Sequence, residues 1–112
     1  MHELSLCHSI VAIAEVAARG RRVRVVELDV GNLRQVVPAT LAYCWDFVTP
    51  STTLEGSTLK IHSIEGTLKC QDCLKETTLR DTPILVCDFC ESTKVDILTG
   101  EEFMVTSLVL ED

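Results

Sequence analysis

Two C-x-x-C pairs constrain this chain more than any other feature. The pairs are Cys70 with Cys73 and Cys87 with Cys90, and 13 residues separate them. Each pair can present two thiolates to one ion from a tight turn, and the intervening segment is long enough to fold back and bring the second pair to the same ion. Four thiolates suit tetrahedral Zn(II), so the sequence predicts a structural zinc site. A redox dithiol and an iron site are the alternatives.

The cysteine-rich stretch is too short to bury much apolar surface, so we expect metal binding to supply much of its stability. The other two cysteines, Cys7 and Cys44, have no C-x-x-C partner. They are expected to be small buried hydrophobic residues on helices.

Composition narrows the class of protein. The chain has 112 residues, 46% of them hydrophobic, and a net charge of −7. The length suits one domain, or one domain with a small satellite, and the acidic balance argues against a general nucleic-acid binder. There is no apolar run of the roughly 18–20 residues that a membrane helix needs. The N-terminus lacks the basic and apolar regions of a signal peptide, so we expect a cytoplasmic protein.

Hydrophobic spacing predicts two helices, three strands and a cysteine-rich module. In chain order these are a helix over 4–19, a strand over 22–31, a helix over 37–48, a strand over 57–65, the module over 67–93 and a strand over 101–111. This order predicts an α+β fold in which two helices pack on one face of a small three-stranded sheet, with an inserted four-cysteine zinc-ribbon-like domain.

The position of the module sets the expected domain boundaries. We expect the strand after the module to pair with the strand before it, with short connections near Gly66 and over 94–100 acting as a hinge. Residues 1–66 and 95–112 then form one domain, and residues 67–94 form the inserted domain.

The N-terminus carries a second feature of chemical interest. His2 follows Met1 directly, so the Met1 amine, the His2 amide nitrogen and His2 Nδ1 can close two chelate rings, with the Glu3 amide as an alternative donor. Deprotonated amide nitrogens favour square-planar Ni(II) or Cu(II) over Zn(II). The other histidines, His8 and His62, are expected to be surface or capping residues.

The chain resembles the HypA/HybF family of hydrogenase-maturation nickel chaperones along nearly its whole length. The residues that carry the resemblance are Met1–Cys7, Val30–Leu33, Thr53–Ile61, the two C-x-x-C pairs, Thr99–Phe103 and Ser107 with Leu108. The family pattern has glycine where Leu74 and Glu91 stand, and proline where Asp88 stands. Because glycine eases a left-handed turn, these differences affect the turns that carry the cysteines.

The resemblance implies a nickel-binding domain with an inserted zinc-binding domain. It implies that Met1, His2 and Glu3 hold Ni(II) as transferable cargo, through the N-terminal amine, backbone nitrogens and the His2 imidazole. It also implies that the four C-x-x-C cysteines hold a structural Zn(II). The implied partners are a nickel-loading GTPase accessory protein and the large subunit of [NiFe]-hydrogenase, with urease as a further target in some members. The implied role is that of a carrier and not an enzyme, and a homodimer is left open.

Two other functions are alternatives to the metallochaperone hypothesis. The first is a zinc-ribbon adaptor for nucleic acid or the transcription machinery, but the cysteine loop has few basic residues and Phe89 is its only aromatic residue. The second is a dithiol oxidoreductase, which needs one C-x-x-C to open a helix beside a strand. No phosphate-binding loop or nucleophile elbow supports a catalytic role.

Overall fold

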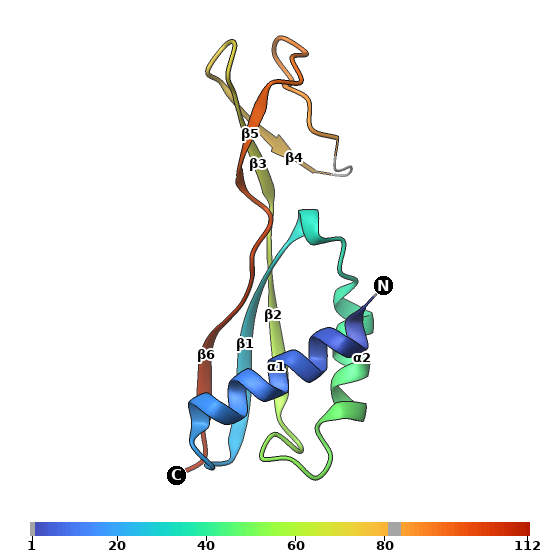
Figure 1. The fold of residues 1–112 in the computed structure, drawn as a ribbon, viewed down its shortest axis with the longest axis vertical. Helices are drawn as coiled ribbons and strands as arrows, with labels where there is room; N and C mark the ends of the chain where they lie inside the picture. The colour runs from blue at the N-terminus through green and yellow to red at the C-terminus, as the bar shows by residue number, and fades with distance from the viewer. Residues whose placement is uncertain (1, 81–83) are drawn as a thin grey trace. The chain divides into compact units, whose positions relative to one another are not determined.

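The computed structural model describes residues 2–80 and 84–112 (Figure 1). The chain forms two compact units. Unit 1 comprises Met1–Asp29, Val36–His62 and Met104–Asp112, and unit 2 comprises Val30–Gln35 and Ser63–Phe103. No helix among the described residues is long and apolar enough to cross a membrane.

The predicted helices and strands all form, with ends within a few residues of those expected. The elements are α1 (Glu3–Ala18), β1 (Val23–Gly31), the 3-10 helix η1 (Asn32–Arg34), α2 (Pro38–Val48), β2 (Thr58–Ile64), β3 (Gly66–Cys70), β4 (Glu76–Leu79), β5 (Val95–Thr99) and β6 (Phe103–Leu110). Arg19 ends α1 in the left-handed region, at φ 53°, and its N–H bonds to the carbonyl of Glu15. Pro38 is the first residue of α2, where its missing N–H leaves no helical hydrogen bond unmade.

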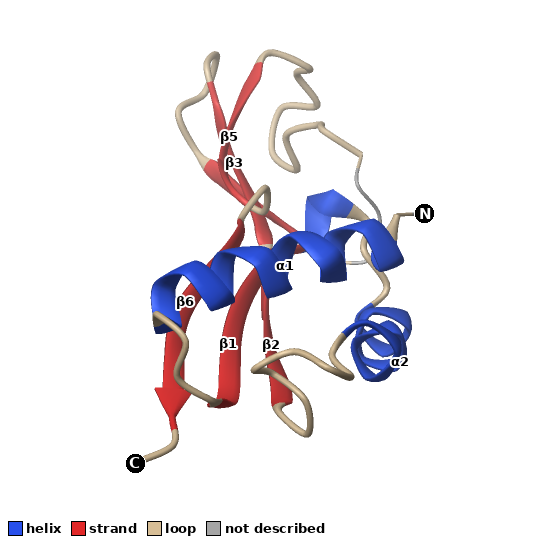
Figure 2. Ribbon diagram, turned by 60° about the horizontal axis from the view of Figure 1, so that its bottom comes forward, coloured by secondary structure: helices blue, strands red, loops and turns tan. Residues whose placement is uncertain are grey.

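Unit 1 has an apolar core between its helices and a three-stranded sheet of order β2-β1-β6. Figure 2 shows α1 crossing the sheet with α2 beside it, which confirms the predicted α+β fold class. Every second residue of β1 from Val26 to Val30 is buried, while Arg24 is exposed and Val23 is buried, so the alternation breaks at Val25 and Val26. The buried helix residues are Cys7, Ile10, Val11, Ala14 and Ala18 from α1 and Leu41, Trp45 and Val48 from α2.

Two details of the helices bear on the expectations. Cys7 is fully buried on α1 and its thiol donates to the carbonyl of Leu41 at 3.3 Å, whereas Cys44 on α2 is half-buried. Burial raises the pKa of the Cys7 thiol to about 11. Val37 precedes α2 and is 51% exposed, although the predicted helix over 37–48 included it. As the N-cap residue it has extended backbone angles, so the helical periodicity does not apply to it.

The expected pairing of the strand after the cysteine module with the strand before it is wrong. β6 pairs with β1, on the opposite edge from β2. The prediction failed because β3 follows β2 after a single residue, and β3 pairs in a second sheet with β5.

Unit 2 contains this second sheet, of order β4-β3-β5. β3 pairs antiparallel with β4, from Gly66 opposite Leu79 to Lys69 opposite Glu76. It also pairs antiparallel with β5, with a register irregularity between Thr67 and Leu68. Residues 94–100, expected to be a connection, therefore contain a strand. The alternation of Val95, Ile97 and Thr99 is the signal for it, but five residues are a weak basis for predicting a strand.

Candidate metal centres

The four cysteines of the two C-x-x-C pairs converge in unit 2. Their sulfur atoms all lie within 4.8 Å of one another. Cys70 Sγ is 3.5 Å from Cys90 Sγ, and Cys73 Sγ is 3.6 Å from Cys87 Sγ. A tetrahedral Zn(II) with Zn–S bonds of about 2.3 Å has sulfur–sulfur edges of about 3.8 Å. The sulfur set therefore fits a four-thiolate zinc centre.

Two matching turns, here called knuckles, position these sulfurs. In the first knuckle, the N–H of Cys70 donates to the carbonyl of Lys75 at 2.9 Å and the N–H of Leu74 donates to the carbonyl of Cys70 at 3.1 Å. The second repeats this pattern, with Cys87 N–H bonded to Ser92 and Glu91 N–H bonded to Cys87, both at 3.0 Å. The two loops lie side by side in both views (Figures 1 and 2).

Backbone N–H groups of the knuckles favour the thiolate forms that a metal requires. The N–H groups of Asp72 and Cys73 each lie 3.4 Å from Cys70 Sγ, and the bond from Cys73 is the main cause that lowers the pKa of Cys70. Around Cys87, the N–H groups of Cys90 and then Phe89 lower the pKa of the thiol to about 6. These donors prepare one sulfur in each knuckle to bind a cation.

Leu74 and Glu91 adopt left-handed backbone angles, with φ 65° and 60°. They are the two positions at which the family that the sequence resembles has glycine, and the knuckle turns form here with leucine and glutamate. We predict that Leu74→Gly stabilises the zinc-loaded protein by about 1 kcal/mol, because a left-handed turn strains a residue with a Cβ atom. Chemical denaturation followed by zinc release measures this change. A destabilised Leu74→Gly protein would contradict it.

Of the residues predicted to bind nickel, His2 and Glu3 lie at the start of α1, and Met1 lies outside the described residues. His2 is exposed and its carbonyl accepts the N–H of Leu6 at 2.9 Å, which closes the first helical turn. Glu3 is only 5% exposed, and its carboxylate accepts the N–H of Val37 at 3.2 Å. This hydrogen bond lowers the pKa of Glu3 and connects the start of α1 to the start of α2.

The other histidines lie elsewhere on unit 1. His8 is exposed on α1. His62 on β2 has Nε2 2.8 Å from Glu27 Oε1, and Ser107 donates to the other oxygen of the same carboxylate at 3.1 Å. Neither this pairing nor the Glu3–Val37 hydrogen bond was predictable from local sequence patterns, because each joins residues far apart in the chain.

Comparisons with known proteins place the chain in a family. Residues 1–110 match the family model described as "Hydrogenase/urease nickel incorporation, metallochaperone, hypA". The protein named hydrogenase maturation factor HypA from Trichodesmium erythraeum is 37% identical over 112 residues, covering 100% of this chain and 97% of that one. The protein of the same name from Geotalea uraniireducens is 38% identical over 111 residues, covering 99% of this chain and 100% of that one.

A solved structure shares the fold. The solution structure of the Ni metallochaperone HypA from Helicobacter pylori matches with a TM-score of 0.70 at 23% sequence identity, covering 98% of this chain and 97% of that one. Together with the family model and the full-length relatives, this shows that the chain belongs to the HypA family of metallochaperones for nickel incorporation into hydrogenase and urease.

Proposed function

We propose that this chain binds Ni(II) at its N-terminus and delivers it during maturation of [NiFe]-hydrogenase, as a carrier without catalytic activity of its own. The match of residues 1–110 to a nickel-incorporation family carries this proposal. The alternative function, a nucleic-acid adaptor, has no support in these comparisons.

The nickel ligands proposed are the Met1 amine, backbone nitrogens of His2 and Glu3, and the His2 imidazole. His2 is exposed and precedes α1, so a partner can approach it from solvent. The buried Glu3 side chain, bonded to the N–H of Val37, holds the start of α1 against the start of α2. Nitrogen donors of this kind favour square-planar Ni(II), and their pH-dependent deprotonation suits a metal that is handed on.

The zinc centre is proposed to be structural, held by Cys70, Cys73, Cys87 and Cys90. The sulfur geometry and the N–H groups that donate to the sulfurs support this assignment. When bound, the ion supplies a cross-link between the two knuckles and takes no part in nickel chemistry. The soft thiolate site retains Zn(II), whereas the nitrogen site exchanges Ni(II).

Replacing His2 with alanine should abolish tight nickel binding while zinc stays bound at one ion per chain. The untagged protein is required, since an N-terminal extension removes the free amine. Nickel titration with the absorption band of square-planar Ni(II) as the readout measures this effect. His8→Ala is the matched control, because His8 is also exposed and lies on α1. Unchanged nickel binding by the His2→Ala protein would reject the N-terminal site.

The proposed partners are a nickel-loading GTPase accessory protein and the hydrogenase large subunit, in the cytoplasm. A homodimer is a further proposal, which sedimentation equilibrium tests. The net charge of −7 favours encounter with a basic surface on a partner and disfavours nucleic acid. The predicted domains, residues 1–66 with 95–112 for nickel and residues 67–94 for zinc, stay a prediction that limited proteolysis of the zinc-loaded protein tests.

A further inference from the structure

Leu74 combines two unfavourable features at the end of unit 2 that the knuckles form. Its φ of 65° lies in the left-handed region, and its side chain is 68% exposed. Glycine would make the same turn without the strain and without exposing an apolar side chain. The left-handed turn positions the knuckle, but the exposed leucine side chain is not needed to form it. Strain kept at an exposed position points to a use for the side chain itself.

A second apolar side chain is exposed in the other knuckle. Phe89 is 60% exposed, and Lys75, the residue after Leu74, has its Nζ 4.8 Å from the centroid of the Phe89 ring. Ser92 donates to the carboxylate of Asp72 at 2.6 Å, which joins the two knuckles directly. Lys75 follows Leu74 in the chain and lies over Phe89, so these three residues belong to one end of unit 2, here called the apolar tip.

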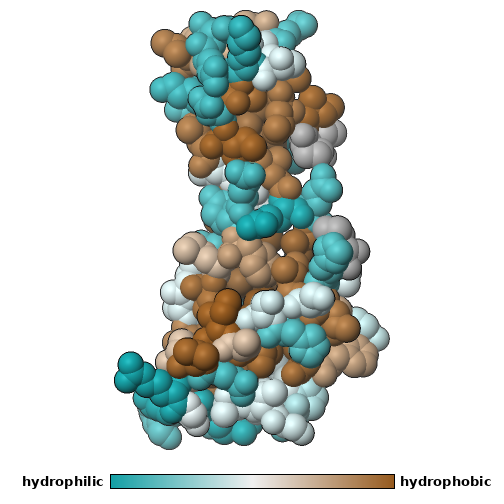
Figure 3. Space-filling model, viewed as in Figure 1, coloured by the Kyte–Doolittle hydropathy of each residue, from teal (hydrophilic) through white to brown (hydrophobic). Residues whose placement is uncertain are grey.

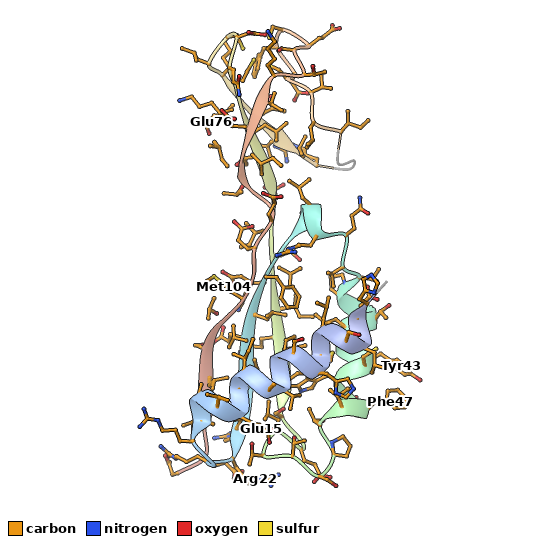
Figure 4. All side chains as sticks on the ribbon, viewed as in Figure 1. Glu15, Arg22, Tyr43, Phe47, Glu76 and Met104 are labelled. Atoms are coloured by element: carbon orange, nitrogen blue, oxygen red, sulfur yellow. The ribbon has the colours of Figure 1, made fainter. Side chains whose placement is uncertain are left out.

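The charge around the apolar tip is negative. Residues 69–76 and 87–96, which contain the knuckles and their flanks, hold five carboxylates and three ammonium groups: Asp72, Glu76, Asp88, Glu91, Asp96, Lys69, Lys75 and Lys94. A zinc ion with four thiolates adds two further negative charges, because the thiolates outnumber the charge of Zn(II). Figure 3 shows hydrophilic residues over this end of unit 2, and Figure 4 labels Glu76 beside it. These charged groups, here called the acidic rim, carry a net negative charge that repels phosphate groups and attracts cationic side chains.

We propose that the apolar tip is a docking surface for a protein segment that places an apolar side chain against Leu74 and Phe89 and flanks it with lysine or arginine. The exposed apolar pair provides contact area, the left-handed turn presents Leu74 outward, and the acidic rim selects a basic partner. This surface shares no residue with the proposed nickel site, so the proposal does not depend on nickel binding.

The test is an NMR titration of the zinc-loaded, ¹⁵N-labelled full chain with a synthetic peptide in which two leucines lie between pairs of lysines. We expect saturable shifts confined to the two knuckles and their flanks, and at least tenfold weaker binding by Leu74→Gly and by Phe89→Ser. Phe47→Ser is the matched control, because Phe47 is 63% exposed on α2 beside Tyr43 (Figure 4) and should leave binding unchanged. A peptide with glutamate in place of each lysine should not bind.

Three outcomes would overturn the proposal. The first is equal peptide binding by both tip variants, with zinc content of one per chain confirming that they are folded. The second is tighter binding of a single-stranded 12-nucleotide RNA than of the peptide at the knuckles, which would make the partner a nucleic acid. The third is self-association, by sedimentation velocity, that Leu74→Gly abolishes, which would make the partner a second copy.

Discussion

Replacing Cys73 with serine is expected to release zinc and to unfold unit 2 while unit 1 stays folded. The buried apolar residues described in unit 2 are Val30, Leu68, Cys70 and Cys87, so half of this small core consists of metal ligands. Unit 1 instead has a core of buried aliphatic side chains and Trp45, none of which is a proposed metal ligand. Loss of one thiolate should weaken zinc binding by roughly a thousandfold or more, since structural zinc contributes its binding energy to folding.

Two probes separate the units in this experiment. Trp45 is the single tryptophan, is 2% exposed and donates to Ser57 at 3.0 Å, so its fluorescence reports on unit 1. A colorimetric zinc chelator reports on unit 2. The control is Cys44→Ser, because Cys44 is half-buried like Cys73 and lies outside the sulfur cluster. A Cys73→Ser protein that keeps one zinc at unchanged affinity would show that the four-thiolate assignment is wrong.

Local patterns in the sequence were sufficient to predict much of this fold. Helical and strand periodicities depend on neighbours a few residues apart, and they located both helices and three strands. The C-x-x-C spacing likewise predicted that four sulfurs converge, because each pair is fixed within one knuckle. The departure from glycine at Leu74 and Glu91 also identified, from sequence alone, two of the positions where the backbone is left-handed.

Pairing between distant segments was not predictable in the same way. Nothing in the local pattern of β6 distinguishes β1 from β2 as its neighbour, and β5 is too short for its alternation to stand out. The bond between the Glu3 carboxylate and the Val37 N–H spans 34 positions. Such contacts depend on how the helices and strands pack against one another. That packing cannot be predicted from the local patterns of a single sequence.

Gly31 is another residue whose distant contacts could not be predicted from the sequence. The sequence pattern placed it at the end of a strand and indicated nothing about what it packs against. In unit 2 the N–H of Gly31 donates to the carbonyl of Glu102 at 2.7 Å. The N–H of Leu33 donates to the carbonyl of Gly100 at 2.8 Å. These bonds draw two backbone segments together. A Cβ atom on residue 31 would lie 2.0 Å from the carbonyl oxygen of Gly100 and 2.6 Å from the nitrogen of Glu101.

Gly31→Ala should therefore destabilise unit 2 by about 3 kcal/mol or more, because backbone atoms must move to admit the methyl group. The φ of Gly31, −75°, is one that alanine adopts readily, so the effect is steric. Gly20→Ala is the contrasting control: its φ is +84° and nothing lies within 4 Å of the added Cβ, so only backbone strain of about 1 kcal/mol is expected. Denaturant titration compares the two variants, with zinc release as the readout for Gly31→Ala in unit 2 and Trp45 fluorescence as the readout for Gly20→Ala in unit 1. If Gly31→Ala costs no more than Gly20→Ala, residues 31 and 100 do not approach as closely as described.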